Sequence, residues 1–237
     1  MVFQCERVLE TGEMFGAEAL LRWKHSDLGL ISPTEFIPVA ERNGTIIDIG
    51  QWVLEQSIKT CSNWHKSGAN HLSISVNVSP IQLLRPDFSH LIASLLNTYQ
   101  LDGKWLILEL TELILVESKQ DFLGAIKQIR NLGVQIAIDD FGTGYSNLGY
   151  LQRIDATILK IDKRFVQGML NSKNDRAIVE TIINMAKIFK LKCVAEGVEN
   201  KTLAMELKKM GADIGQGFYW SKPIQLNQFN ARLLQTT

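Results

Sequence analysis

Short apolar runs alternate with longer amphipathic stretches along most of the chain, and this alternation constrains the fold more than any other feature. The short runs have the length and the β-branched content of strands. Eight strands alternating with helices predict an α/β protein built as a (β/α)8 barrel. A doubly wound open sheet is the alternative, because alternation alone does not decide whether the sheet closes. The eight runs are residues 2–9, 15–22, 72–78, 105–110, 134–138, 157–161, 191–195 and 213–217.

The connection between the first two runs is too short for a parallel crossover. Only residues 10–14 separate them, whereas a crossover between parallel strands needs about a dozen residues or more. A connection of this length suits a hairpin. We therefore expect the first strand to run antiparallel to the second.

Caps and glycines mark where the helices between the strands begin and end. Serine followed by proline is typical of a helix start, and a capping box marks the first turn. Glycine is typical of the residue just beyond a helix. The expected starts are Ser32-Pro33, Thr45-x-x-Asp48, Ser79-Pro80 and Ser118-x-x-Asp121, and the expected ends lie near Gly68, Gly133 and Gly211.

Charge and cysteine content narrow the partners and the compartment. Lysine plus arginine and aspartate plus glutamate both number 25, so the chain lacks the basic excess of proteins that grip polymeric nucleic acid. The three cysteines form no C-x-x-C pair, and the four histidines show no ligand spacing. A disulfide framework and a zinc site are therefore not expected. No apolar run is long enough to span a bilayer, so we expect a cytoplasmic domain, or the cytosolic part of a membrane-anchored protein.

Polar side chains stand at the carboxyl ends of seven predicted strands, and these ends share one rim in a barrel. A single acid at a strand end is more often a cap or a solvated residue, but seven in succession favour a site. Glu18 and Glu109 lie among apolar neighbours, where a carboxylate needs a partner or a metal. The residues are Glu18, Asn77, Glu109 with Glu112, Asp139 with Asp140, Lys160 with Asp162, Glu196 with Glu199, and Gln216.

The donor types at this rim favour a hard divalent cation. Glu18, Asn77, Glu109 and Asp139 offer only oxygen ligands, which suit Mg²⁺ or Mn²⁺. Asp139 and Asp140 are neighbours, which on a strand point to opposite faces, so both reach one cluster only if the strand gives way to a loop there. The glycines that follow fit such a loop, which we expect to be mobile. An aspartate pair at this point suits a carboxylate shared between two metal ions, as in in-line phosphoryl displacement.

Lys160 leaves a different chemistry open. A lysine in a barrel strand can form a Schiff base with a carbonyl substrate, as in aldolase-type lyases. That chemistry does not need so many carboxylates, so we rank it below metal-assisted phosphoryl transfer.

Seven ordered blocks of the sequence resemble the EAL domain family. The similarity runs from about Phe3 to Pro223. Two positions depart from the family pattern: Cys5 stands after Gln4 where the family usually has proline, and Asn147 stands where it usually has serine. The blocks are Glu18-Ala19-Leu20-Leu21-Arg22-Trp23, Asn77-Val78-Ser79, Glu109-Leu110-Thr111-Glu112, the run from Asp139 to Ser146, Lys160-Ile161-Asp162, the run from Ala195 to Glu199, and Gln216-Gly217-Phe218 with Pro223.

The resemblance implies a fold, a reaction and a role for each matching residue. The fold is a modified TIM barrel with an antiparallel first strand, and the reaction is hydrolysis of cyclic di-GMP to linear 5′-pGpG with Mg²⁺ or Mn²⁺. By motif position, the first metal would be held by Glu18, Asn77, Glu109 and Asp139, with Asp140 serving a second metal or the attacking water. Lys160 would orient that water, Glu196 would act as base or metal ligand, and Glu112 would anchor the loop. The substrate would lie against Gln4, Leu20, Arg22, Pro33 and Gln216.

The resemblance also implies an assembly. Members of the family often dimerise through the loop after the fifth strand and the helix beyond it, and often follow an N-terminal sensory or regulatory domain. We accordingly treat residues 1–237 as a single domain of this family, of the kind that also occurs within longer proteins. Degenerate members bind cyclic di-GMP as receptors without cutting it, and this is the alternative function. Every motif acid and the lysine are present here, which favours the enzyme.

Overall fold

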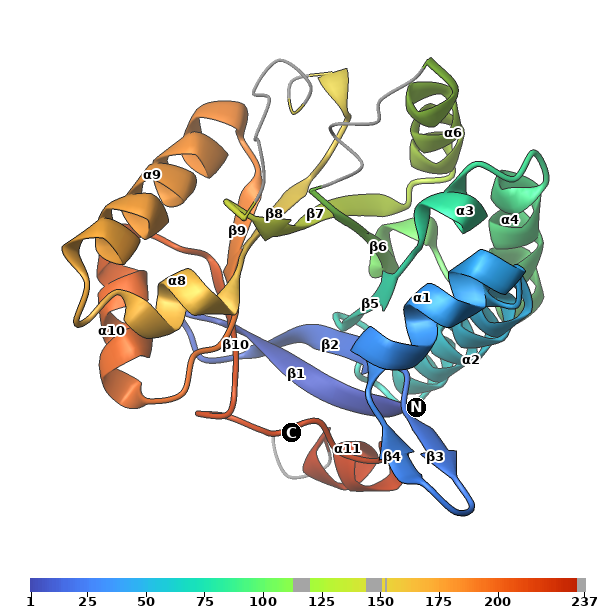
Figure 1. The fold of residues 1–237 in the computed structure, drawn as a ribbon, viewed down its shortest axis with the longest axis horizontal. Coiled ribbons are helices and arrows are strands. Elements are labelled where there is room, and N and C mark those ends of the chain that lie inside the picture. The colour runs from blue at the N-terminus through green and yellow to red at the C-terminus, as the bar shows by residue number, and fades with distance from the viewer. Residues whose placement is uncertain (113–119, 144–150, 152, 234–237) are drawn as a thin grey trace.

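Eight strands close into a barrel in the order β1-β10-β9-β8-β7-β6-β5-β2 (Figure 1). The structure is a computed structural model and describes residues 1–112, 120–143, 151 and 153–233. All eight predicted strands form, the barrel is confirmed, and the open-sheet alternative is wrong. The strands are β1 (Val2–Val8), β2 (Met14–Leu20), β5 (Ser73–Asn77), β6 (Leu106–Thr111), β7 (Gln135–Phe141), β8 (Ile158–Ile161), β9 (Lys192–Ala195) and β10 (Ile214–Gln216).

Strand β1 runs antiparallel to both of its neighbours, β2 and β10, while the other barrel pairs are parallel. The short connection to β2 turns at Gly12, whose φ of 77° lies in the left-handed region that glycine tolerates best. The Arg7 side chain donates to the Gly12 carbonyl at 2.7 Å. The hairpin prediction is confirmed, and the N-terminal end of β1 thereby reaches the same rim as the carboxyl ends of the other strands.

Helices surround the barrel (Figure 1). Among the described residues, none of the helices combines the length and apolar character needed to cross a bilayer. The helices are α1 (Pro33–Asn43), α2 (Ile46–Lys66), α3 (Pro80–Leu83), α4 (Phe88–Tyr99), α6 (Gln120–Asn131), α8 (Lys163–Gly168), α9 (Lys173–Phe189), α10 (Lys201–Met210) and α11 (Leu226–Leu233), with a 3₁₀ turn η1 (Gly103–Trp105) before β6.

The predicted helix starts differ in outcome. Ser79 forms a full capping box with Gln82, and Ser32 stands before proline at the first position of α1. The capping box predicted at Thr45 is wrong, because Thr45 itself has helical backbone angles and its hydroxyl pairs with Asn43 instead of the helix. The start predicted at Ser118 lies outside the described residues.

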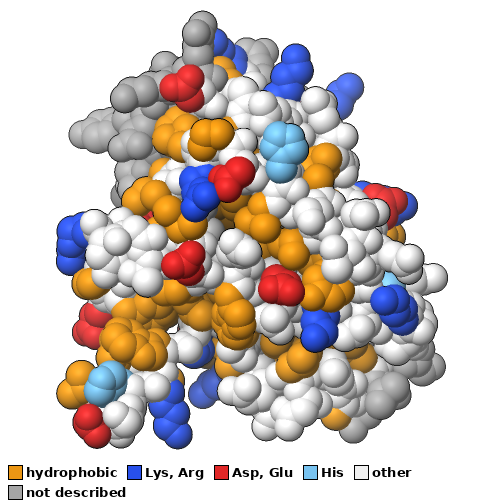
Figure 2. All heavy atoms as spheres, turned by 90° about the vertical axis from the view of Figure 1, so that its right-hand side faces the viewer, with side chains coloured by type: hydrophobic (Ala, Val, Ile, Leu, Met, Phe, Trp, Pro, Cys, Tyr) orange, Lys and Arg blue, Asp and Glu red, His pale blue; other side chains and the backbone are white. Residues whose placement is uncertain are grey.

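A small hairpin that the sequence did not predict stands out from the body of the molecule. Strands β3 (Trp23–His25) and β4 (Gly29–Ile31) form a separate two-stranded sheet between β2 and α1. Trp23 holds the base of the hairpin through an edge contact with Phe36 of α1, with ring centres 5.7 Å apart. Figure 2 shows the hairpin projecting beside the face that α1 and α2 form.

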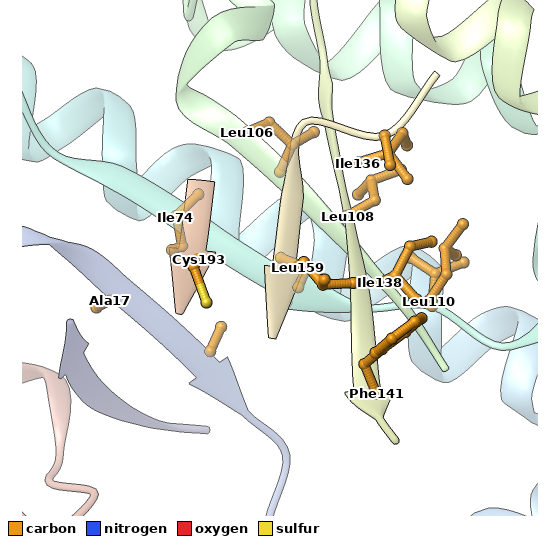
Figure 3. Close-up of a cluster of buried hydrophobic side chains, with 14 of the residues drawn as sticks. Ala17, Ile74, Leu106, Leu108, Leu110, Ile136, Ile138, Phe141, Leu159 and Cys193 are labelled. Atoms are coloured by element: carbon orange, nitrogen blue, oxygen red, sulfur yellow. The ribbon is translucent and has the colours of Figure 1, made fainter. Parts of the chain in front are cut away.

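Side chains of successive residues in each strand point alternately out toward the helices and into the barrel. Side chains that point outward pack under the helices, as Ile74, Leu108 and Leu159 do in the main core (Figure 3). Those that point inward form a small apolar layer deep in the barrel, and a polar layer lies above it at the rim. The deep layer consists of Ile107, Ala137, Ile158, Val194 and Ile214, with Phe15 packed against them.

A glycine substitution tests the close approach between η1 and the chain that leaves α6. A Cβ at Gly103 would collide with the Leu132 carbonyl, and backbone cannot swing away as a side chain can. We expect Gly103→Ala to lower the free energy of unfolding by about 1–3 kcal/mol. Gly124→Ala is the matched control, since a Cβ there meets nothing within 4 Å and alanine favours helix by up to about 1 kcal/mol. Denaturant unfolding of both variants and of the parent measures the difference. A Gly103→Ala variant as stable as Gly124→Ala would contradict the clash.

Candidate active site

The polar layer gathers the strand-end residues at one mouth of the barrel. Glu18, Glu109, Asp139 and Lys160 are buried, and Lys160 is only 1% exposed. Alternation along each strand accounts for this convergence, because every one of these side chains occupies an inward position just above the deep apolar layer. The layer consists of Gln4, Glu18, Asn77, Glu109, Asp139, Lys160 and Gln216, with Glu196 directly after β9.

Lys160 lies at the centre of the acidic cluster. Its Nζ lies 2.7 Å from Glu196 Oε1, 2.8 Å from Glu109 Oε2, 3.5 Å from Asp139 Oδ1 and 3.8 Å from Glu18 Oε2. The contact with Glu109 lacks hydrogen-bond direction, so both carboxylate oxygens of Glu109 are without a hydrogen-bond partner among the described residues. Burial opposes the charge of Lys160, but Asp139, Glu109 and the other acids outweigh it and hold the lysine pKa well above its usual value.

Glu18 is held by two amides in addition to the lysine. Asn77 Nδ2 donates to Glu18 Oε1 at 2.6 Å, and Gln216 Nε2 donates to Glu18 Oε2 at 2.7 Å. Burial opposes ionisation of this carboxyl, but Lys160 and these hydrogen bonds together lower its pKa below the usual value. Glu18 is therefore a carboxylate at neutral pH, fixed in orientation.

Asp139 and Asp140 share one side of β7 through a backbone irregularity. We predicted that the strand would end before them, but it continues to Phe141. Instead, the register with β8 shifts between Ile138 and Phe141, and Asp140 has a φ of 54° in the left-handed region. This turn of the backbone cancels the alternation. Carboxylate oxygens of Asp139, Asp140 and Glu196 consequently lie within 4.8 Å of one another.

Three of the carboxyls hold protons more tightly than an ordinary acid. Burial is the main cause, and neighbouring carboxylates add to it. The pKa of Glu109 is raised well above its usual value, that of Glu196 to about 8 and that of Asp140 to about 6. Protons held by these acids thus offset part of the negative charge that the single lysine does not balance.

The site fits divalent cations. It offers oxygen donors only, an excess of carboxylates over cations, and in Glu109 two buried oxygens without a hydrogen-bond partner among the described residues. These are the properties of Mg²⁺ and Mn²⁺ sites. Binding of a metal would neutralise the charges that now raise the pKa of the acids.

Glu112 directly follows β6 and contacts the start of the loop after β7 rather than joining the acidic cluster. Gly142 N donates to Glu112 Oε2 at 2.9 Å, and Glu112 N donates to the Asp139 carbonyl at 3.0 Å. This agrees in position with the predicted anchor, while residues 144–150 of the loop, with the family departure at Asn147, lie outside the described residues.

A cavity of about 530 Å³ opens above the acidic layer. Gln4, Leu20, Arg22 and Gln216 line it, as expected of residues along a substrate. Pro33, in the first turn of α1, is not among the residues that line this cavity. A volume of this size is typical of small-molecule sites.

Some residues of the site were not foreseen. Lys163 and Gln167 line the cavity from α8, and the signal that could have found them is that this helix follows the carboxyl end of β8. Phe218 lines it as an aromatic side chain that is 54% exposed. Glu6 is buried in β1 below Gln4, and burial raises its pKa to about 7.

The comparisons with known proteins agree with this geometry. A family model described as the EAL domain matches residues 1–223. The chain is 38% identical over 229 residues to "Bifunctional diguanylate cyclase/cyclic di-GMP phosphodiesterase MucR" of Pseudomonas aeruginosa, covering 97% of this chain and 33% of that protein. It is 34% identical over 224 residues to "Oxygen sensor protein DosP" of Escherichia coli, covering 94% and 28%. The chain thus spans about a third of the length of these relatives.

Solved structures show the same fold. The structure described as "PaMucR Phosphodiesterase, c-di-GMP complex" superposes with a TM-score of 0.92 at 37% identity, covering 96% of this chain and 92% of that one. The EAL enzyme Bd1971, in its form bound to cAMP and cyclic di-GMP, superposes with a TM-score of 0.92 at 34% identity, covering 98% and 63%. The match extends through every strand of the barrel and its acidic rim, and we conclude that this chain belongs to the EAL domain family.

Proposed function

We propose that this chain is a metal-dependent phosphodiesterase that hydrolyses cyclic di-GMP to linear 5′-pGpG. The carrying observation is a buried lysine surrounded by Glu18, Glu109, Asp139 and Glu196. Three of these acids, Glu18, Asp139 and Glu196, line a cavity of about 530 Å³. Two comparisons with MucR support the substrate, since its name includes cyclic di-GMP phosphodiesterase and its phosphodiesterase structure is described as a complex with that nucleotide.

The acids and Asn77 are proposed as the metal ligands. Glu18, Asn77, Glu109 and Asp139 would hold one ion, and Asp140 would serve a second ion or the attacking water. When bound, Mg²⁺ or Mn²⁺ supplies Lewis-acid polarisation of the phosphoryl oxygens and balances their charge. The hydrogen bonds from Asn77 Nδ2 and Gln216 Nε2 fix the Glu18 carboxylate in one orientation, and Gln216 would act there as outer-shell partners do in metal sites.

Lys160 and Glu196 are proposed to orient and deprotonate the attacking water. The Lys160 ammonium contacts Glu196 Oε1 at 2.7 Å, so a water bound beside this pair would receive a hydrogen bond from the lysine while the carboxylate takes its proton. The water oxygen forms a bond to phosphorus, the bond from phosphorus to the ribose 3′-oxygen breaks, and that oxygen leaves to be protonated from solvent. The same Glu196 also lies within ligand distance of the aspartate pair, which keeps a metal-ligand role open.

The environment of Lys160 weakens the Schiff-base alternative. A lysine that attacks a carbonyl must be an unprotonated amine, which requires a lowered pKa. Here four carboxylates lie within 4 Å of Nζ and raise the pKa. The ammonium form suits a donor to water and phosphate oxygens instead.

The rim residues are proposed to hold the dinucleotide. Arg22 reaches the cavity as a cation for a phosphate, and Gln4, Leu20 and Gln216 line its walls. Pro33 remains a predicted contact outside this cavity. A homodimer and an N-terminal regulatory domain are further proposals from the family resemblance, and MucR, which is about three times as long as the matched segment, is an example of a longer relative.

Chromatography of cyclic di-GMP incubated with the purified chain tests the function. We expect 5′-pGpG to appear with Mg²⁺ or Mn²⁺ and no product with EDTA. Saturable binding of cyclic di-GMP without turnover would favour the alternative function, a receptor that does not cut it. Neither turnover nor binding would reject cyclic di-GMP as the ligand.

Metal binding should stabilise the fold more at high pH than at low pH. In the metal-free protein the folded pKa of Glu196 is raised to about 8 and that of Asp140 to about 6. The folded chain therefore keeps protons on these acids at pH values where the unfolded chain, whose acids have pKa values of about 4, has released them. The free energy of unfolding of the metal-free protein falls as the pH rises from about 4 to about 8. Metal replaces these protons, so its affinity grows over the same range.

Thermal unfolding with and without Mg²⁺ measures this effect. We expect a larger rise in Tm near pH 8 than near pH 5. Glu13→Gln, an exposed acid of the β1–β2 turn, is the control and should behave as the parent. An equal rise at both pH values would show that these carboxyls are not the metal ligands.

A further inference from the structure

Exposed apolar side chains concentrate on one face beside the catalytic mouth. Among the described residues, five of the twelve large hydrophobic side chains that are exposed lie here, on the hairpin and on α1 and α2 (Figure 2). Single exposed apolar residues are ordinary, whereas a contiguous group of them marks an interaction site. The five are Trp23, Leu28, Leu30, Val39 and Trp52.

The face combines a groove with a projection. The groove has a volume of about 580 Å³ and runs between the base of the hairpin and the two helices, with Phe36, Val39 and Trp52 among its mostly apolar walls. The projection is the end of the hairpin, where Leu28 and Leu30 are 72% and 74% exposed. The hairpin pairs through only three residues on each strand, and a two-stranded hairpin of this kind is marginally stable in water without further packing.

We propose that this face is a self-association surface, on which the β3–β4 hairpin of each copy places Leu28 and Leu30 in the groove of a second copy. The projection and the groove adjoin on one face. A twofold axis between two copies therefore places the hairpin of each copy in the groove of its partner, and the assembly is complete as a dimer. The hairpin carries Lys24 and Asp27, and the groove is lined by Asp48 and Arg22, so the partner's groove offers an opposite charge for each charge of the hairpin. A small ligand would fill the groove but leave both leucines in water, whereas a second copy covers both features.

The contact would adjoin the active site, because Arg22 lines both the groove and the catalytic cavity. It also differs from the dimer contact implied by the family resemblance, which involves the loop after β7 and the helix beyond it. The proposal does not depend on the proposed reaction, since it concerns the surface alone.

Sedimentation of the full chain over a dilution series tests self-association. We expect a dimer whose dissociation constant rises about 100-fold when Leu28 and Leu30 are both changed to serine, because each buried leucine contributes about tenfold. Both side chains are mostly exposed, so the variant should fold as the parent does, which circular dichroism checks. Ile188→Ser, an exposed residue of α9, is the control and should leave the constant unchanged. A monomeric parent, or a dimer that the double variant does not weaken, would overturn the proposal.

Disulfide trapping tests the placement of the hairpin. The native cysteines Cys5, Cys61 and Cys193 are buried, so an introduced surface cysteine reacts selectively. A mixture of the Leu28→Cys chain and the Val39→Cys chain should give a cross-linked heterodimer on mild oxidation, whereas Ile188→Cys mixed with Val39→Cys should not. A dimer by sedimentation without the first cross-link would show that another surface forms it.

Discussion

Replacement of Glu18 by alanine is expected to lower the rate of cyclic di-GMP hydrolysis by about 10³-fold or more. Glu18 is the carboxylate in the cluster whose pKa is lowered, so it is charged when a metal approaches. It is also the one that two amides, of Asn77 and Gln216, hold in place. Its removal takes away a proposed ligand and the acceptor of the Asn77 amide, and leaves the Gln216 amide with the longer 3.4 Å contact to Gln4 Oε1.

Two further variants distinguish the loss of a metal ligand from the loss of side-chain packing at Glu18. Glu18→Gln keeps the volume but removes the charge, and should lose nearly as much activity as alanine. Glu13→Gln removes an exposed carboxylate in the β1–β2 turn and should retain full activity. Metal titration of each variant by calorimetry gives a second measurement. Full activity of Glu18→Ala, with unchanged metal affinity, would remove Glu18 from the site.

Replacement of Lys160 by methionine is expected to damage both stability and rate. Within the described residues, Lys160 supplies the only cation within 4 Å of Glu18, Glu109, Asp139 and Glu196. Removing one partner of a buried ion pair costs about 3–5 kcal/mol, so the metal-free variant should unfold at a much lower denaturant concentration. The rate should fall by about 10²–10⁴-fold, the usual contribution of a positioned proton donor.

Added metal and a second variant distinguish the two effects. Mg²⁺ should return part of the lost stability of Lys160→Met, because it balances the same carboxylates, but should not return the rate. Lys160→Arg keeps the charge with a planar, forked donor group and should recover stability more than activity. Denaturant unfolding measures the stability of each variant, and product chromatography measures its rate. Normal stability of Lys160→Met without metal would contradict the central role assigned to its charge.

Much of the fold could be predicted from the sequence because hydrophobic periodicity is strong in the barrel strands. The eight runs predicted an α/β fold and favoured the barrel over an open sheet, which alternation alone did not exclude, and the short turn predicted the reversal of β1. The β3–β4 hairpin was missed since its strands have three residues each and an exposed, partly polar sequence. Too few side chains of this hairpin are buried for periodicity to show.

The members of the candidate site were predicted better than their geometry. Strand ends converge in any barrel, so the acids could be placed at one rim from their positions alone. The bend that brings Asp140 beside Asp139 could not, because a non-glycine residue with a φ of 54° has no reliable sequence signal. Nor could sequence reasoning decide that Lys160 is almost fully buried, as burial depends on how the rim closes over it.

The reversed direction of β1 has a mechanical consequence. In a fully parallel barrel, polypeptide joined ahead of the first strand would leave at the end opposite the chemistry. Here it would leave beside the catalytic mouth, only a few residues from Gln4, whose side chain lies 3.4 Å from Gln216 Nε2. Gln216 in turn holds Glu18. Tension applied at the N-terminus would therefore act along a short path of hydrogen bonds to a proposed metal ligand, without crossing the barrel.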